Sequence, residues 1–252
     1  MTPPVFLVPG LQVAQPDGVV RLDGSEGHHA LRALRLGIGE PVTLVDGCGR
    51  RVEGRIVGVG PDGVADVSVD SVVEEPEPVP RVTVVQALPK SDRAELAVEV
   101  LTEIGVDEIV PWSARNCVTQ WKADRVERGL RRWRDTAAAA AKQSRRARVP
   151  VITSLASTSD VLSRVARVDR AIVLDEGAGT SIADIDVPGT GEVLVVVGPE
   201  GGIAPDEREA LRGAGAHVVR LGPTVLRTST AGVAAVAVLL ARSSRWDARM
   251  QA

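Results

Sequence analysis

The stretch VLVVVGPEGGIAPDE, residues 193–207, decides the fold of this chain of 252 residues. Its five leading apolar residues predict a strand that is buried on both faces, as in a parallel sheet. A glycine-rich turn follows, and Pro205, Asp206 and Glu207 are typical of the first turn of a helix. Because ligands bind parallel α/β sheets at the carboxyl ends of strands, the turn predicts a ligand site. A tight strand-to-helix connection is the alternative.

The same alternation of strand and helix runs through the chain from residue 82 onward. Further apolar runs occupy residues 82–88, 108–112, 171–175 and 217–221. Helical patterns start at Ser91 and at Asp124, and Gly105 predicts the end of the first helix. Along the second helix the sequence places an apolar stripe of Val126, Leu130, Trp133 and Ala137. The alternation predicts a parallel α/β sheet.

The stretch LGPTVLRTSTA, residues 221–231, predicts a second ligand loop, between the last strand and an Ala- and Val-rich helix. Leu221 and Leu226 are placed to sandwich an apolar heterocycle. Thr228 or Thr230 is placed to cap the helix or to contact a ribose. Neither a Walker A pattern nor a G-x-G-x-x-G after a strand occurs, which makes a dinucleotide dehydrogenase the weaker alternative.

Arg227 is the unusual member of this second loop. It stands between an apolar residue and the start of a helix, where an ordinary core would place Leu or Val. A guanidinium that is buried or faces a cleft needs an anionic partner. Arg227 is therefore expected to contact either an anionic ligand or a carboxylate in a structural ion pair.

The first 75 residues differ from the rest of the chain. They contain five short β-rich runs, VFLV, VVRL, PVTLVD, RVEGRIVGV and VADVSVDSVV, separated by turn sequences. This pattern predicts a small barrel or sandwich over residues 1–75. The prolines of EEPEPVP, residues 74–80, cannot continue a strand ladder, so residues 76–81 are expected to form a linker to a domain at residues 82–252.

The composition excludes several classes of protein. Cys48 and Cys117 lack a partner at ligand spacing, so neither a metal site nor a disulfide is indicated, and a cytoplasmic protein is expected. No apolar run is long enough to cross a membrane. The net charge is −3, but residues 122–148 hold ten Lys or Arg against three acidic residues. Such a stripe is by default a solvated helix face. Arg145, Arg146 and Arg148 cluster just before Pro150, and this cluster favours phosphate contact.

The chain resembles the 16S rRNA uridine-N3 methyltransferases of the SPOUT superfamily, whose C-terminal half carries GPEGG and a later LGxxxLRTETA. The resemblance covers nearly the whole chain. It also includes HHALRALR at His28 to Arg35, VDGCGR at Val45 to Arg50, QALPKSDR around Lys90, SARNC at Ser113 to Cys117 and KQSRRARVP at Lys142 to Pro150. The ordered set of motifs is far more specific than any one of them.

The resemblance implies an α/β fold with a SPOUT-type parallel sheet and a C-terminal trefoil knot, preceded by a small PUA-like β-barrel that binds RNA. Periodicity alone predicts an unknotted sheet. The implied activity is S-adenosylmethionine-dependent methylation of N3 of a uridine in 16S rRNA of the small ribosomal subunit, by a homodimer without a metal. The alternatives are a methyltransferase of this superfamily that acts on another RNA and a non-catalytic ribosome-binding factor.

The motifs also imply the residues of the site. Those expected to hold the methyl donor are Leu174, Gly198, Pro199, Glu200, Gly201, Gly202, Leu221, Gly222, Pro223, Leu226, Thr228, Thr230 and Ala231. Those expected to bind RNA are Arg32, Arg35, Lys90, Arg115, Arg145, Arg146 and Arg148.

Arg227 is the expected catalytic residue, stabilising the anion that develops on uracil. Ser229 stands where the family usually has Glu, so no carboxylate base is proposed at that position, and residues 1–8 lack the family's frequent Arg.

Overall fold

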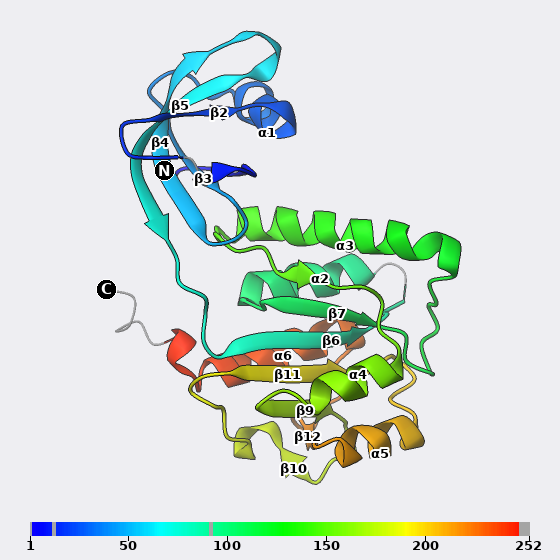
Figure 1. The fold of residues 1–252 in the computed structure, drawn as a ribbon. Coiled ribbons are helices and arrows are strands. Elements are labelled where there is room, and N and C mark those ends of the chain that lie inside the picture. The colour runs from blue at the N-terminus through cyan, green and yellow to red at the C-terminus, as the bar shows by residue number, and fades with distance from the viewer. Residues whose placement is uncertain (1, 12–13, 91–92, 247–252) are drawn as a thin grey trace. The chain divides into compact units, whose positions relative to one another are not determined.

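The computed structural model describes residues 2–11, 14–90 and 93–246, and Figure 1 shows the helices and strands. The chain divides into two compact units. The N-terminal unit consists of Met1–Glu77 and Ala141–Val149, and the C-terminal unit of Pro78–Ala140 and Pro150–Ala252. Ser91, at which the sequence predicts the start of a helix, lies outside the described residues. No helix within the described ranges is long and apolar enough to cross a membrane.

The N-terminal unit contains a five-stranded sheet in the order β1-β3-β4-β5-β2. Its strands are the five predicted β-rich runs: β1 (Val5–Leu7), β2 (Val19–Leu22), β3 (Pro41–Val45), β4 (Arg50–Val59) and β5 (Ala65–Glu74). Neighbouring strands are antiparallel except β1 and β3, which are parallel. The short helix α1 (Gly24–His28) and the π-turn His29–Ala33 follow β2.

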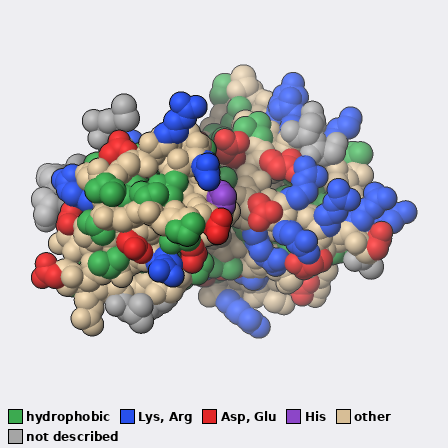
Figure 2. Space-filling view, turned by 90° about the horizontal axis from the view of Figure 1, so that it is seen from above, with side chains coloured by type: hydrophobic (Ala, Val, Ile, Leu, Met, Phe, Trp, Pro, Cys, Tyr) green, Lys and Arg blue, Asp and Glu red, His purple; other side chains and the backbone are tan. Residues whose placement is uncertain are grey.

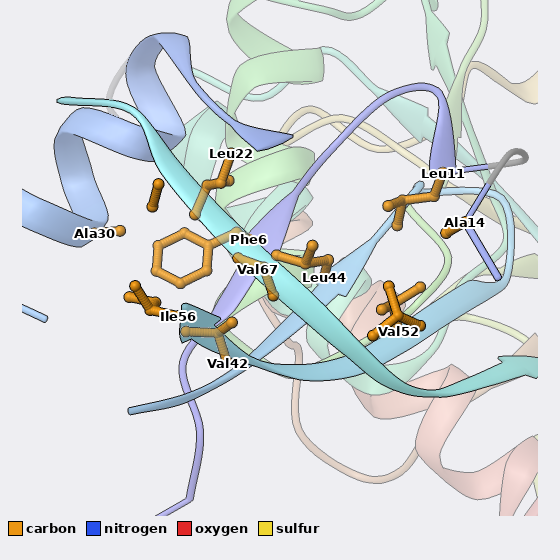
Figure 3. Close-up of a cluster of buried hydrophobic side chains, with 12 residues drawn as sticks. Phe6, Leu11, Ala14, Leu22, Ala30, Val42, Leu44, Val52, Ile56 and Val67 are labelled. Carbon is orange, nitrogen blue, oxygen red and sulfur yellow. The ribbon is translucent and has the colours of Figure 1, made fainter. Parts of the chain in front are cut away.

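The core of this unit surrounds Phe6, the only phenylalanine of the chain. Figure 3 shows its ring among aliphatic side chains that include Val42, Ile56 and Val67, and all four side chains are fully buried. The ring of His29 lies edge-on to Phe6 with the ring centroids 6.2 Å apart. Alternate residues of β4 and β5 point into this core, which is why their sequences alternate between apolar and polar residues.

The C-terminal unit contains a seven-stranded sheet in the order β10-β12-β9-β11-β6-β7-β8, in which all neighbours are parallel. The strands are β6 (Arg81–Ala87), β7 (Glu108–Trp112), β8 (Val151–Ile152), β9 (Arg170–Leu174), β10 (Thr180–Ser181), β11 (Glu192–Val197) and β12 (His217–Arg220). The helices are α2 (Ala94–Ile104), α3 (Ala123–Gln143), α4 (Thr158–Val165), α5 (Pro205–Gly213) and α6 (Thr228–Leu240). The predicted parallel α/β class is confirmed.

Strand β11 lies in the interior of this sheet, between β9 and β6. Residues Val193–Val197 are at most 1% exposed, because neighbouring strands cover both edges and helices cover both faces. Figure 1 shows α2 and α6 behind the sheet and α4 and α5 in front of it. The strand that decides the fold is thus the centre of the unit, and the turn after it opens at the sheet's carboxyl edge.

The structure confirms the predicted end of α2 and the predicted apolar stripe of α3. Gly105 ends α2 with a left-handed φ of 107°, as predicted. The predicted stripe of α3 is buried at Leu130, Trp133 and Ala137 and half-buried at Val126.

The predicted threonine cap of α6 is wrong. Arg227 is the N-cap residue, and no side chain caps the helix. Thr228 is its buried first residue, and the hydroxyl of Thr230 donates to the carbonyl of Arg227 at 3.3 Å.

The segment Ala141–Val149 joins the N-terminal unit, although 63 residues lie between Glu77 and Ala141. Its backbone is hydrogen-bonded there: Gly49 donates to Ala147 at 3.1 Å and Val149 donates to Gly47 at 2.9 Å. Lys142 forms an ion pair with Glu26 at 2.5 Å. The N-terminal unit is therefore completed by a segment from the middle of the chain.

Candidate functional site

A cavity of about 990 Å³ lies at the carboxyl edge of the C-terminal unit's sheet. Three loops form most of its wall, and each follows a strand: residues 174–177 follow β9, residues 197–203 follow β11 and residues 221–228 follow β12. Lys90 and Arg93, between β6 and α2, add to the wall. Because parallel strands end together, loops distant in the sequence converge there.

The cavity brings together most of the residues predicted to hold the donor. Those that line it are Leu174, Gly198, Pro199, Glu200, Gly201, Gly202, Leu221, Gly222, Leu226, Thr228 and Ala231, while Pro223 and Thr230 do not. Lys90, predicted to bind RNA, also lines the cavity, and so does Arg227, the predicted catalytic residue. Ser229 is not part of the wall; it is 2% exposed and belongs to the buried start of α6.

The loop Gly198–Gly202 has the backbone that its glycines permit. A Cβ on Gly198 would lie 2.7 Å from Cγ1 of Ile203, so a larger residue would collide with the end of the loop. Gly202 has a φ of 73°, a left-handed conformation that glycine adopts without strain. Its N–H donates to the carbonyl of Pro199 at 2.9 Å, which closes the turn.

The side chain of Glu200 turns back to the protein. Its carboxylate accepts the backbone N–H of Lys90 at 3.0 Å, which joins the loop after β11 to the loop after β6. The glutamate of the GPEGG motif is therefore part of what fixes the loop.

The first turn of α5 holds two other loops. Asp206 pairs with the guanidinium of Arg115 at 2.6 Å, and this hydrogen bond lowers the pKa of the Asp206 carboxyl. Arg208 pairs with Asp175 in the cavity wall at 2.7 Å, which raises the pKa of Arg208. Glu207, 5% exposed, accepts the hydroxyl of Thr158 at 2.7 Å. Three consecutive side chains thus fix α5 to the loops after β7 and β9 and to the start of α4.

Arg227 is exposed at the cavity wall and, among the described residues, has no ion pair or side-chain hydrogen bond. Of the two predicted partners of Arg227, a carboxylate in a structural ion pair is therefore not found among the described residues, and contact with an anionic ligand stays a prediction. Its neighbours Val225 and Leu226 are 71% and 40% exposed. This part of the second loop presents an unpaired cation beside apolar side chains.

The cavity wall combines both charges with apolar surface. Its cations are Lys90, Arg93, Arg208 and Arg227, and its carboxylates are Asp175, Glu176 and Glu200. Four of these residues were not predicted, because they lie outside the two glycine motifs and only the fold brings them together: Arg93, Asp175, Glu176 and Arg208. Within the described ranges, no group of three or more His, Cys, Asp or Glu could hold a metal ion.

The other residues predicted to bind RNA belong to different surroundings. Arg32, Arg35 and Arg145 are exposed on the N-terminal unit, and Arg145 has a left-handed φ of 60°. Arg148 is packed instead: its guanidinium donates to the carbonyl of Glu75 at 2.7 Å and occupies the space where Gly49 would carry a Cβ. Arg146 also follows the end of α3 and is half-buried.

The basic stripe along α3 is a mixed surface within the C-terminal unit. Arg132 pairs with Glu95 at 2.5 Å, and Arg134 pairs with Glu127 at 2.9 Å. Figure 2 shows blue and red side chains interspersed along this side of the molecule. Exposed pairs of this kind contribute little to stability, and this part of the stripe has the character of a solvated helix face.

Comparison with known proteins gives matches along both units. Residues 75–240 match the family described as an RNA methyltransferase domain, and residues 22–65 match the family described as an RNA methyltransferase PUA domain. Ribosomal RNA small subunit methyltransferase E of Mycobacterium bovis is 47% identical over 234 residues, 91% of this chain and 89% of that protein. The protein of the same name from Bacillus subtilis is 28% identical, over 86% of this chain and 88% of the relative.

The fold has solved counterparts. A crystal structure of ribosomal RNA small subunit methyltransferase E from Neisseria gonorrhoeae, bound to S-adenosyl methionine, matches with a TM-score of 0.84 and 25% sequence identity. The match covers 95% of this chain and 98% of that chain, so both units have a counterpart in it.

Proposed function

The chain belongs to the RNA methyltransferase family, and we propose that it methylates N3 of one uridine in 16S ribosomal RNA of the small ribosomal subunit. It is an S-adenosylmethionine-dependent RNA methyltransferase. The observation that carries the proposed function is the convergence of both glycine motifs on one cavity at the carboxyl edge of the sheet. The relatives named for the small ribosomal subunit supply the substrate class.

The residues of the cavity fit S-adenosylmethionine. The donor has an adenine, a ribose, a carboxylate and two cationic groups, and the wall offers apolar, anionic and cationic side chains. Leu174, Leu221 and Leu226 would contact the adenine, because apolar side chains form most of the wall of such pockets. The glycines at 198, 201 and 202 would let backbone groups approach the ribose and the methionine part. The bound donor supplies a methyl group on a positively charged sulfur.

The residues of this chain would prepare the uracil for transfer. N3 of uracil is a poor nucleophile while it is protonated, so the site must stabilise the ring anion that forms when the proton leaves. Arg227 supplies a cation at the cavity wall that no protein carboxylate among the described residues neutralises. A preorganised charge of this kind is worth most in a site from which substrate binding excludes water. Lys90 and Arg93 would contact the RNA backbone.

Two measurements test this function. Calorimetry of the folded protein should show S-adenosylmethionine binding, whereas an absence of binding would favour a non-catalytic ribosome-binding factor. Mass mapping of ribosomal RNA from cells that lack the gene should show the loss of one N3-methyluridine from 16S rRNA, which the wild-type gene restores. An unchanged 16S rRNA, with a methyl group missing from another RNA, would place the substrate elsewhere.

A homodimer is part of the proposal, and α6 supports it. This helix has apolar residues on all sides, and its buried face packs against α2, β6 and β11. Val233, Ala234, Ala237 and Val238 remain half-buried on the other face. Helices that are apolar all round are normally covered, so a second copy of the chain is the proposed cover. Sedimentation of the wild type should give a dimer, and Val233→Asp should give a monomer.

The finer features of the fold also belong to this proposal. Residues 1–75 would form a PUA-like barrel that binds RNA, residues 76–81 the linker, and residues 82–252 a SPOUT domain with a trefoil knot near the second loop. The family matches and the order of the parallel strands support this assignment. Stretching a single molecule from its ends would test the knot, because a knotted chain extends less on unfolding than an unknotted chain of the same length.

A further inference from the structure

We infer that Asn116 is a positioning residue for the methyl donor, an inference that rests on the proposed donor site. Asn116 lies after β7, outside both glycine motifs and outside the cavity wall. Its amide nitrogen lies 3.1 Å from the carbonyl oxygen of Gly202 and 3.4 Å from that of Gly201. It therefore contacts two successive peptide groups of the donor loop.

These contacts set the direction of groups that line the cavity. In a trans peptide the N–H points opposite to the C=O, so fixing one group fixes the other. The carbonyl of Gly202 shares its peptide group with the N–H of Ile203, which belongs to the cavity wall. The carbonyl of Gly201 shares its peptide group with the N–H of Gly202, which closes the turn onto Pro199. Asn116 thus orients both peptide groups.

The position of Gly201 also depends on Asn116. A Cβ on Gly201 would lie 3.3 Å from Cβ of Asn116 and 3.4 Å from its carbonyl oxygen. The first contact is tighter than an ordinary van der Waals contact, so a side chain at position 201 would shift Asn116 slightly. Residues 116 and 201 therefore lie close together, and the glycine makes this approach possible.

Asn116 is itself held in place, which it must be to position another group. The backbone N–H of its neighbour Arg115 donates to both carboxylate oxygens of buried Glu207, at 3.2 and 3.3 Å. The flanking residues Ala114 and Cys117 are buried, and the N–H of Cys117 donates to the carbonyl of Ala114 at 3.1 Å. Asn116 therefore projects from a fixed turn, and removing its amide should loosen the donor loop without unfolding the unit.

The test compares Asn116→Ala with Asn116→Asp. Alanine removes the two donated hydrogen bonds, so the Kd for S-adenosylmethionine should rise about fivefold, the equivalent of one ordinary hydrogen bond. Aspartate keeps the size of the side chain but faces two carbonyl oxygens with a carboxylate, so its Kd should rise further, by about tenfold or more over the wild type. Calorimetry measures both. In assays on small ribosomal subunits, the KM for the donor should rise similarly while kcat at saturating donor stays within about twofold.

Val118→Ala is the matched control, since this side chain is 71% exposed two residues away. It should leave the Kd unchanged. The melting temperature without donor should be the same in all variants, which separates positioning from a loss of folding. Unchanged Kd values in both Asn116 variants would overturn the inference, and so would an Asp variant that binds as well as the Ala variant. A wild type that is folded but does not bind S-adenosylmethionine would instead refute the proposed function.

Discussion

The two loops that carry the glycine motifs and line the cavity differ in how they are held. The first, Gly198–Gly202, is fixed by a turn of its own and by hydrogen bonds from Lys90 and Asn116. In the second, residues 223–227 are all exposed, and residues 223–226 make no hydrogen bond within the described part of the chain. One wall of the cavity is preformed and the other has few contacts of its own. The difference suggests that the first loop holds the donor through its fixed backbone, while the second adds Leu221 and Leu226 to the donor pocket and Arg227 to the contact with the uracil.

The largest effect should come from the second loop. Arg227→Ala should lower kcat about 100-fold, the cost of removing one preorganised group that stabilises charge in a transition state. The Kd for S-adenosylmethionine should stay within about twofold, because the proposed donor contacts of the second loop are Leu221 and Leu226 and not Arg227. Methyl transfer to small ribosomal subunits and calorimetry measure the two quantities. Arg220→Ala, at an exposed arginine at the end of β12, is the control. A wild-type rate in the Arg227 variant would show that Arg227 does not stabilise the anion on uracil.

A pair of glycine substitutions compares the loops directly. Gly198→Ala should raise the Kd for the donor about tenfold, since its Cβ would lie 2.7 Å from Cγ1 of Ile203 and the loop must shift. Gly222→Ala should raise the Kd less than Gly198→Ala does, because a Cβ there meets no protein atom within 4 Å and the loop need not shift. Calorimetry measures the Kd for the donor in both variants. Equal effects would show that the first loop is no more constrained than the second.

A smaller effect is expected from the ion pair between Arg208 and Asp175, which lies in the loop after β9. Arg208→Gln should raise the Kd about threefold, because Asp175 loses its 2.7 Å partner but keeps the N–H of Gly177 at 2.8 Å. Arg208→Lys should restore part of the affinity. The effect should shrink at high salt, since Arg208 is only half-buried and salt screens its ion pair in part. A salt-independent loss would indicate that Arg208 contacts the donor itself.

The smallest perturbation is to add the donor without changing a residue. Backbone amides at 224–226 should exchange hydrogen rapidly in the free protein and slow down when S-adenosylmethionine is present. The amide of Gly202, already hydrogen-bonded to Pro199, should be protected in both states. Hydrogen-exchange mass spectrometry resolves the two segments. Equal protection of both loops in the free protein would show that the second loop is held as firmly as the first.

The sequence predicted much of the site because the relevant signals are local. An uninterrupted apolar run followed by GPEGG predicted β11 and its turn, and Gly105 predicted the end of α2. The threonine cap of α6 was wrong, and the choice between a ligand and an ion pair for Arg227 stayed open, for a common reason. Residue type shows what a side chain can do, but whether Thr228 is buried and Arg227 exposed depends on the elements packed around them.

The sequence by itself determined the alternation of strand and helix, the parallel class of the sheet and the two glycine loops at its edge. These follow from hydrophobic periodicity and from the backbone freedom of glycine, which act over a few residues. Only the tertiary structure decided that Asn116 and Arg208 reach the donor loops and that Ala141–Val149 completes the N-terminal unit. Such contacts join residues tens of positions apart, and no local pattern records which distant segment will provide the partner.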